Sequence, residues 1–294
     1  MIGRIYRLGL YLIAPITIAA AYVHVALGLT YAALTFGWIG RRGRDAAIVA
    51  WSRILLLIIG VRLQSVGDLP PDLPSPAGGR GAGGEGAPPP GSVLLLNHTS
   101  WLDVFAIAAA VPARFVSKAE IRRWPVFGWL AILVGTIFIE RGRRHAVMRT
   151  VHEVSDRLRS GLTIAIFPEG TTTDGSMLLP FHANLVQPAL DLGAPLRPVG
   201  IRFTQRGEFS RAAMYIDDMT MMQSLWRIVT APYLSVELHW LPPIDPPPTN
   251  RHAAARAARA AIAHALDIPL EEHELLASED SLPSPLPLAG EGQG

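Results

Sequence analysis

A long apolar run near the N-terminus constrains most strongly what this chain can fold into. From Leu8 to Ile39, His24 is the only residue that can carry charge near neutral pH. As one helix the run would measure about 48 Å, longer than the roughly 30 Å hydrocarbon core of a bilayer. Two interpretations fit: a tilted or kinked single span with Pro15 near its start, or two shorter helices that enter one leaflet and return. A buried helix of a soluble core fits this length and uniform apolarity less well.

The residues around this run also indicate membrane attachment. Arginines flank it on both sides, which gives no clear orientation by the positive-inside rule and mildly favours the two-helix interpretation. The run is too long for a cleavable signal peptide. Apolar residues keep helical spacing from Asp45 to Leu63, which favours an interfacial helix over a core helix. His24 has no evident partner, so we expect it to pack and not to function chemically. We expect residues 1–66 to anchor the chain.

The amino-acid composition excludes several classes of function and site. Half of the 294 residues are hydrophobic and only 17% are charged, which suits a globular domain with a membrane-attached segment. The chain has no cysteine, so disulfides and thiolate metal sites are excluded, and its nine histidines have no spacing typical of a metal site. A formal net charge of +2 does not suggest a nucleic-acid partner. We expect no metal and no nucleic acid.

Two segments resemble each other and contain little that could form a core. Leu69 to Gly91 is dominated by proline and glycine, and its Leu73-Pro74-Ser75-Pro76 recurs as Leu282-Pro283-Ser284-Pro285. Such composition cannot bury enough apolar surface to order itself. We predict a disordered insert over residues 67–91 and a disordered tail over 271–294. A glycine-rich phosphate loop is not indicated, because no Gly-x-x-x-x-Gly-Lys-Ser/Thr pattern is present.

Between these segments, residues 92–270 read as one catalytic domain. Short apolar runs of strand type alternate with helical segments, which predicts an α/β fold with a mixed, largely parallel sheet flanked by helices. In such sheets ligands gather at the carboxyl ends of the strands. His98, Arg141 and Glu169 all fall just past predicted strands. The predicted strands are 93–96, 114–118, 136–139, 162–167, 199–203 and 234–241, and the main predicted helices are 104–110, 147–158, 185–192 and 250–266.

The strand at 93–96 leads directly into a pair of residues suited to proton transfer. His98 follows the strand, and Asp103 lies in or near the first turn of the next helix. This spacing can bring the carboxylate back to the imidazole, so that one ring nitrogen is held and the other can accept a proton. His98 is therefore a candidate general base for a substrate hydroxyl or thiol. Alone, a His–Asp pair five residues apart is a weak signal, because such pairs are common in loops.

Several ordered blocks strengthen this interpretation. Asn97 to Asp103 resembles the N-H-x-S-x-x-D block of the glycerolipid acyltransferases, the family of 1-acyl-glycerol-3-phosphate acyltransferases. Gly135 to Arg141 and Phe167 to Thr171 (Phe-Pro-Glu-Gly-Thr) are similar to the second and third blocks of that family, in the same order and spacing. Lys118 to Trp129 resembles the stretch between the first two blocks, and Pro198 stands where the proline of a fourth block is expected. The resemblance covers roughly residues 93–203.

The resemblance implies a reaction and a set of site residues. A fatty acyl group would pass from a thioester to the free hydroxyl of a lysolipid, 1-acyl-sn-glycerol-3-phosphate giving phosphatidic acid in phospholipid biosynthesis. No cofactor is needed, since acyl-CoA or acyl carrier protein is a co-substrate. Both donors are cytosolic, so the active site would face the cytoplasm at a bacterial inner membrane, with membrane lipids as further partners. The implied catalytic residues are His98 and Asp103, Arg141 would hold the phosphate, and Glu169, Gly170 and Thr171 would shape the acceptor pocket.

One departure from the family keeps the acceptor open. The third block usually carries an arginine after Gly-Thr, where this chain has Thr172 followed by Thr173 and Asp174. The related branch that acylates lyso-ornithine lipid, whose head group is an amino acid, is therefore an alternative. Other classes also stay open: a lysolipid hydrolase using the same dyad on water, and a non-catalytic lipid-binding member. A serine nucleophile at Ser100 is not favoured, because the chain has no Gly-x-Ser-x-Gly elbow; we expect this hydroxyl to cap the helix.

Overall fold

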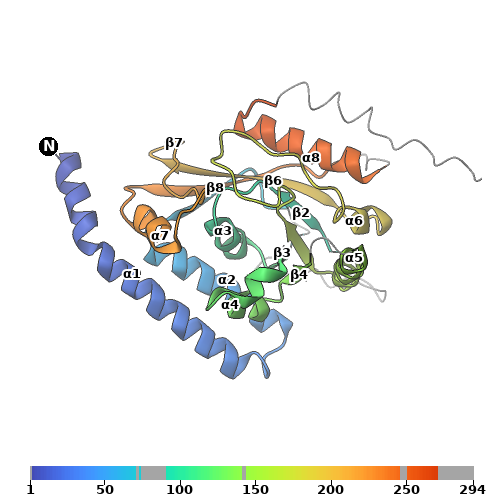
Figure 1. The fold of residues 1–294 in the computed structure, drawn as a ribbon, viewed down its shortest axis with the longest axis horizontal. Helices are drawn as coiled ribbons and strands as arrows, with labels where there is room; N and C mark the ends of the chain where they lie inside the picture. The colour runs from blue at the N-terminus through green and yellow to red at the C-terminus, as the bar shows by residue number, and fades with distance from the viewer. Residues whose placement is uncertain (1, 71–72, 74–90, 141–143, 246–249, 271–294) are drawn as a thin grey trace, which may run out of the picture.

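Helices and strands alternate along most of the chain, as the sequence predicts (Figure 1). The computed structural model describes residues 2–70, 73, 91–140, 144–245 and 250–270. The strands are β1 (Arg62–Val66), β2 (Val93–Leu96), β3 (Ala113–Lys118), β4 (Ile137–Ile139), β5 (Thr163–Ile166), β6 (Leu196–Gln205), β7 (Glu208–Phe209) and β8 (Leu234–Trp240). The helices are α1 (Ile2–Thr35), α2 (Arg41–Ile58), α3 (Leu102–Ala110), the 3-10 helix η1 (Ala119–Arg123), α4 (Phe127–Leu133), α5 (Arg144–Arg159), α6 (Gln187–Asp191), α7 (Met221–Val229) and α8 (Arg251–Leu266).

The strands form one eight-stranded sheet. Its order is β1-β8-β6-β2-β5-β3-β4, with β7 paired to β6 beside this path. Strand β6 is antiparallel to β8 and to β7, and the other pairs are parallel. The carboxyl ends of β2, β5 and β3 therefore lie at one edge, where ligands bind in sheets of this kind. The predicted mixed, largely parallel α/β fold is confirmed.

Helices cover both faces of the sheet. Alternate residues of β2 point to opposite faces, as in any strand: Leu94 and Leu96 belong to one buried cluster, Val93 and Leu95 to another. Buried residues of α1, α2, α3 and α7 complete the first cluster, and those of α5, α6 and α8 complete the second. The two helical layers lie on opposite sides of the sheet in Figure 1. All four residues of β2 are fully buried, which explains why its sequence is apolar without alternation.

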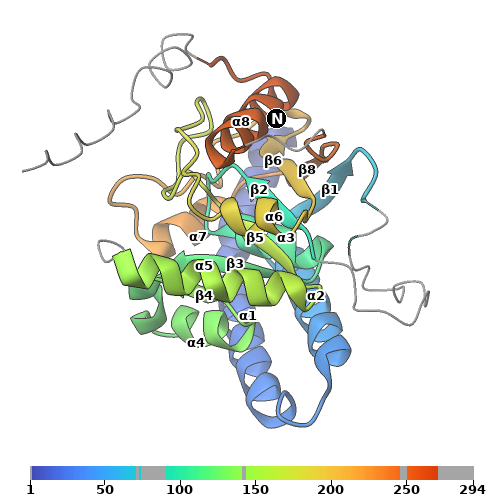
Figure 2. The same ribbon diagram turned by 90° about the vertical axis from the view of Figure 1, so that its right-hand side faces the viewer.

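The N-terminal apolar run forms one helix, not two. Helix α1 is unbroken from Ile2 to Thr35 with Pro15 inside it, and its segment Gly9–Thr35 is long and apolar enough to cross a membrane. After a turn the chain returns along α2, so that α1 and α2 make a helical hairpin (Figure 2). The single-helix interpretation of the run is therefore the one that the structure adopts. Many large apolar side chains of α1 are exposed, including Leu12, Ile16 and Leu27.

The hairpin is closely packed and tied to the sheet domain. A Cβ on Gly28 of α1 would come within 2.1 Å of the Trp51 indole nitrogen, so only glycine allows this approach. The rings of His24 and Trp51 stack at 5.1 Å, and each ring nitrogen bonds the other residue's carbonyl. His24 is thus a packing residue, as expected. Asp45 of α2 forms an ion pair with Arg114 of β3, which links the hairpin to the sheet.

The segment after α2 differs from the prediction. We expected helical structure to continue to Leu63, but α2 ends at Ile58 and Arg62–Val66 is a strand at the edge of the sheet. The cause is Gly60, with φ +75°: its N–H bonds the carbonyl of Leu57, and the next N–H, of Val61, bonds that of Leu56. This is a Schellman motif, which ends a helix. Residues 62–66 therefore belong to the sheet and not to a helical anchor.

The predicted disordered segments fall largely outside the described residues. Residues 71–72 and 74–90 of the insert and the whole tail 271–294 are not described, so their disorder stays a prediction. From Gly91 onward, the described residues contain the predicted strands and helices in the predicted order, with η1, α4, β7 and α7 in addition.

Candidate active site

The end of β2 is anchored so that His98 projects from the carboxyl edge of the sheet. The buried Asn97 side chain donates to the carbonyl of Ile201 and accepts from its N–H, at 2.9 and 2.7 Å. These two bonds join the end of β2 to the neighbouring strand β6. From the sequence alone, Asn97 has no predicted role beyond its place in the motif. The two hydrogen bonds to Ile201 position the next residue, His98. They require a side-chain amide, which can both donate and accept.

His98 and Asp103 form the predicted dyad. Nδ1 of His98 lies 2.9 Å from Oδ2 of Asp103. The same oxygen accepts the N–H groups of Thr99 and Ser100, both at 2.8 Å. Asp103 is fully buried in the first turn of α3, where the helix dipole favours a negative charge. The carboxylate is thus held by three donors and in turn orients the imidazole.

Ser100 does not have the surroundings of a nucleophile. Its side chain is fully buried, and Oγ accepts the N–H of Leu102 at 3.2 Å at the start of α3. This is the helix-capping contact expected for the hydroxyl, although Trp101 stands at the N-cap position itself. A buried hydroxyl that serves the backbone cannot reach a substrate carbonyl. The serine-hydrolase alternative therefore has no support in the geometry.

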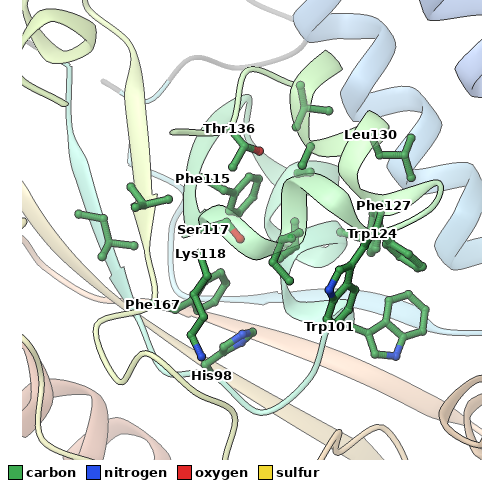
Figure 3. Close-up of a pocket in the computed structure, with 18 of the residues that line it drawn as sticks. His98, Trp101, Phe115, Ser117, Lys118, Trp124, Phe127, Leu130, Thr136 and Phe167 are labelled. Atoms are coloured by element: carbon green, nitrogen blue, oxygen red, sulfur yellow. The ribbon is translucent and has the colours of Figure 1, made fainter. Parts of the chain in front are cut away.

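The other side of His98 faces a large cavity. Its ring stacks on Phe167 with centroids 4.1 Å apart, and 20% of its side chain is exposed. Because Nδ1 is held by Asp103, Nε2 is the ring nitrogen left for a substrate. The cavity measures about 740 Å³, within the usual range for ligand sites, and its lining is mostly apolar (Figure 3). Its walls come from α1, α2, α3, β3, α4 and the loop after β5.

A cation lies beside the dyad. Lys118, the last residue of β3, lines the cavity, and its side chain ends near His98 in Figure 3. From the sequence alone, Lys118 belongs to a stretch that resembles the family and has no predicted role of its own. The signal that could have found it is its position, since it follows a predicted strand in the same way that His98 does.

The third block divides into two parts. Gly170 and Thr171 line the cavity, as does Thr172, whose hydroxyl donates to the carbonyl of Tyr215. Glu169 does not line it and is only 4% exposed. Its Oε1 accepts the N–H of His98 at 2.7 Å, and its Oε2 accepts the N–H of Leu179 at 3.0 Å. Glu169 thus holds the backbone beneath His98 and does not line the cavity, so a part in shaping the acceptor pocket stays a prediction for this residue.

The environment of Glu169 changes its acidity. Burial raises the pKa of this carboxyl from 4.5 to about 7, against the opposing effect of the two backbone N–H groups that favour its charged form. The carboxylate of Asp103 adds a smaller upward effect. Glu169 thus changes charge near neutral pH directly below His98.

Arg141 lies outside the described residues, so its role stays a prediction. Strand β4 ends two residues earlier at Ile139, whose side chain lines the cavity. Glu140, the last described residue before the gap, lies 3.8 Å from Arg149 in an exposed ion pair. The chain therefore approaches Arg141 from the wall of the cavity.

The chain is similar to proteins of known activity. Residues 82–202 match the family model described as Acyltransferase. The lyso-ornithine lipid O-acyltransferase of Pseudomonas aeruginosa is 37% identical over 181 residues, 61% of this chain and 69% of that protein. The 1-acyl-sn-glycerol-3-phosphate acyltransferase of Neisseria gonorrhoeae is 34% identical over 200 residues, 68% of this chain and 72% of that protein.

A solved structure shares the fold. The crystal structure of the 1-acyl-sn-glycerophosphate acyltransferase PlsC from Thermotoga maritima has a TM-score of 0.61 and 19% identity, and the match covers 93% of this chain and 98% of that one. The two relatives, which this chain covers over more than two thirds of their lengths, confirm the resemblance seen in the sequence blocks. The chain belongs to the acyltransferase family, and it is an O-acyltransferase.

Proposed function

We propose that this protein transfers a fatty acyl group from a thioester, on coenzyme A or acyl carrier protein, to the free hydroxyl of a lysolipid. The observation that carries the proposal is the His98–Asp103 dyad at the wall of a large apolar cavity. A hydroxyl is a poor nucleophile near neutral pH, so a positioned base is needed, and an acyl chain needs apolar walls. The two relatives described above are named as acyltransferases that act on lysolipids, which supports the same class of reaction.

In the proposed mechanism, Nε2 of His98 takes the proton of the acceptor hydroxyl as its oxygen attacks the thioester carbonyl. A carbon–oxygen bond forms, and the tetrahedral intermediate collapses with loss of the carbon–sulfur bond. The proton then passes from the imidazolium to the departing thiolate. Asp103 orients the ring and stabilises its charge, so no covalent enzyme intermediate is required.

The developing oxyanion needs hydrogen-bond donors, which backbone amides often supply. The amides of Thr99 and Ser100, at the start of α3, already donate to Asp103. They are therefore not available to a substrate oxygen. Lys118 supports an anionic group beside His98, because it is the only lysine or arginine among the described residues that line the cavity. We assign it to the acceptor's head group or to the oxyanion.

We further propose lysophosphatidate as the acceptor, with lyso-ornithine lipid as the second candidate. Lys118 and the predicted contact of Arg141 favour a phosphate. The second candidate is favoured by Thr172, which lines the cavity at the position where the family usually has arginine. The Thr172 hydroxyl donates to a backbone carbonyl and is not left for a phosphate. Asp174 adds little negative charge to the site, because Arg211 pairs with it at 3.0 Å.

Membrane attachment through α1 is part of the proposal. Its exposed leucine and isoleucine side chains suit lipid, and both donor classes are cytosolic, so the active site would face the cytoplasm of a bacterial inner membrane.

Purified enzyme in vesicles should be given an acyl thioester and, in parallel, lysophosphatidate or lyso-ornithine lipid. Acylated product from either acceptor supports the proposal and identifies the head group. Free fatty acid released without an acceptor would indicate a hydrolase instead. Binding of both lipids without any transfer would indicate a non-catalytic lipid-binding protein.

The cavity wall gives a prediction about chain length. The Trp51 indole lines the cavity and packs on Phe105 at 5.8 Å. Replacing Trp51 with alanine should enlarge the apolar space and shift preference toward longer acyl chains, each added methylene gaining ~0.8 kcal/mol, about fourfold in kcat/KM. The measurement is a competition among acyl thioesters of increasing length. Trp38→Ala is the matched control, because Trp38 is exposed and does not line the cavity. An unchanged length profile in Trp51→Ala would contradict the assignment.

A further inference from the structure

The segment η1–α4 has two different apolar sides. Ile121, Phe127 and Leu130 line the cavity from one side. On the other side large apolar side chains are exposed, and Trp129 is the most exposed of them at 69%. Ile132 is also exposed, and Trp124 lies between the two sides, because it lines the cavity and is 42% exposed. A short segment that covers an apolar cavity and also presents tryptophans outward has the form of a wall between the cavity and another apolar phase.

A strained turn holds this arrangement. Val126 has φ +66° and ψ −58°, and the N–H of Phe127 donates to the carbonyl of Pro125 at 2.7 Å. This is a γ-turn with positive φ, which is rare and costly for a β-branched residue. The turn reverses the chain between η1 and α4 and directs Phe127 toward Trp101, with ring centroids 6.4 Å apart. Strain of this kind persists where the surrounding structure requires a particular geometry.

The outer side also carries positive charge. Arg122 and Arg123 end η1 and are both exposed, and the Arg122 guanidinium lies 5.9 Å from the Phe138 ring centroid. Tryptophan together with arginine is the composition enriched at membrane–water interfaces, where indoles sit at head-group level and cations meet anionic lipids. We define the α4 face as Arg122, Arg123, Trp124, Trp129 and Ile132, of which only Trp124 also lines the cavity.

The α4 face is continuous with the surface already proposed to meet lipid. Helix α1 contacts both α4 and α7, and these helices lie beside it in Figures 1 and 2. Trp226 of α7 is partly exposed and packs against Tyr11 of α1, with ring centroids 6.1 Å apart. Exposed apolar side chains therefore extend from α1 onto the catalytic domain on both sides of the helix.

We propose that the α4 face is a second membrane-contact surface, one that lies in the head-group zone of an anionic bilayer. Helix α1 attaches the chain to the bilayer, and the α4 face holds the cavity wall against the same leaflet. A lipid can then enter the cavity beneath η1–α4 without crossing water. The proposal rests on the proposed attachment through α1, and the experiment below separates the two.

The chain has no cysteine, so single cysteines can report local contact with lipid. Three variants, Ile16→Cys on α1, Ile132→Cys on the α4 face and Ala260→Cys on the exposed side of α8, would each carry an environment-sensitive fluorophore. The full chain is bound to vesicles of phosphatidylcholine and phosphatidylglycerol that contain brominated lipid as quencher. Helix α8 covers the opposite face of the sheet from α1, which makes position 260 the matched control (Figure 1).

Quenching at positions 16 and 132 but not at 260 is the expected result. Quenching at 16 alone would overturn the proposal for the α4 face and leave the attachment through α1 intact. Quenching at 132 without 16 would support the α4 face and overturn the attachment. Quenching at neither position, or at all three alike, would overturn the α4 face.

A charge placed on the α4 face should separate lipid contact from chemistry. Trp129 does not line the cavity, so Trp129→Glu should leave the site intact. In anionic vesicles we expect its acyl transfer to fall about tenfold, because the new carboxylate repels the head groups and the indole that would insert among them is gone. In detergent micelles, where acceptor and donor are dispersed, its rate should stay within about twofold of wild type. Ala260→Glu should change neither rate. Equal rates of Trp129→Glu and wild type in vesicles would overturn the proposal.

Discussion

Replacing His98 with alanine should lower the rate of acyl transfer about 10²–10⁴-fold, the range lost with a positioned general base. The expectation follows from the geometry, because Nδ1 is committed to Asp103 and Nε2 is the one ring nitrogen that can accept the acceptor's proton. Burial of the apolar lining is unchanged, so lipid binding should persist. The measurement is kcat for product formation with saturating thioester and acceptor.

The control for this variant is His252→Ala. His252 is exposed on α8, on the opposite face of the sheet from the hairpin, and should retain the wild-type rate. Both variants should unfold at the wild-type temperature, which separates lost chemistry from lost folding. If His98→Ala kept more than about a tenth of the wild-type rate, the general-base role would be wrong.

Replacing Glu169 with alanine should destabilise the fold by about 2–5 kcal/mol. The carboxylate accepts the N–H groups of His98 and Leu179, and both would lose their partner in a buried setting. The loss would also release the backbone beneath His98, so activity should fall with stability. The measurement is the free energy of unfolding from denaturant titration in detergent. Glu208→Ala, at an exposed carboxylate on β7, is the matched control and should unfold like wild type.

The acidity of Glu169 makes its contribution depend on pH. Because burial raises its pKa to about 7 in the folded protein, the folded state binds the proton more tightly than the unfolded state, whose pKa is near 4.5. The stabilisation is therefore complete below pH 4.5 and is lost as pH rises to about 7, by about 3 kcal/mol. Glu169→Gln lacks this titration, so the stability difference between wild type and this variant should shrink over the same range. A difference that stays constant with pH would contradict the assignment.

Much of the catalytic half of the molecule could be predicted from sequence, for a physical reason. Strand β2 is buried on both faces, so it is a continuous apolar run, and it was predicted at its observed bounds. His98 and Asp103 are five residues apart across the start of a helix, and this spacing places the carboxylate next to the imidazole ring. Local spacing of this kind survives in the folded protein because it depends on few distant contacts.

Other features depend on distant contacts and could not be predicted in this way. Strand β1 has a mostly exposed sequence and forms because β8, more than 160 residues later, offers a parallel edge. Helix α7 has only nine residues, and its capping box of Thr220 and Gln223 was overlooked. Glu169 was predicted to shape the acceptor pocket, with a structural turn carboxylate as the alternative, because its motif identifies the loop but not which side of the loop each side chain takes.

The shared wall of the cavity has a kinetic consequence. Gly28 and Trp51 of the hairpin line the same space as His98 of the sheet domain. A lipid that enters there would arrive by lateral diffusion within the bilayer, not by collision from solution. The velocity should then follow the mole fraction of acceptor among the lipids, a surface concentration. Diluting the acceptor with inert phospholipid, at constant bulk amounts of acceptor and enzyme, should slow the reaction, as it does for enzymes whose substrate supply is two-dimensional.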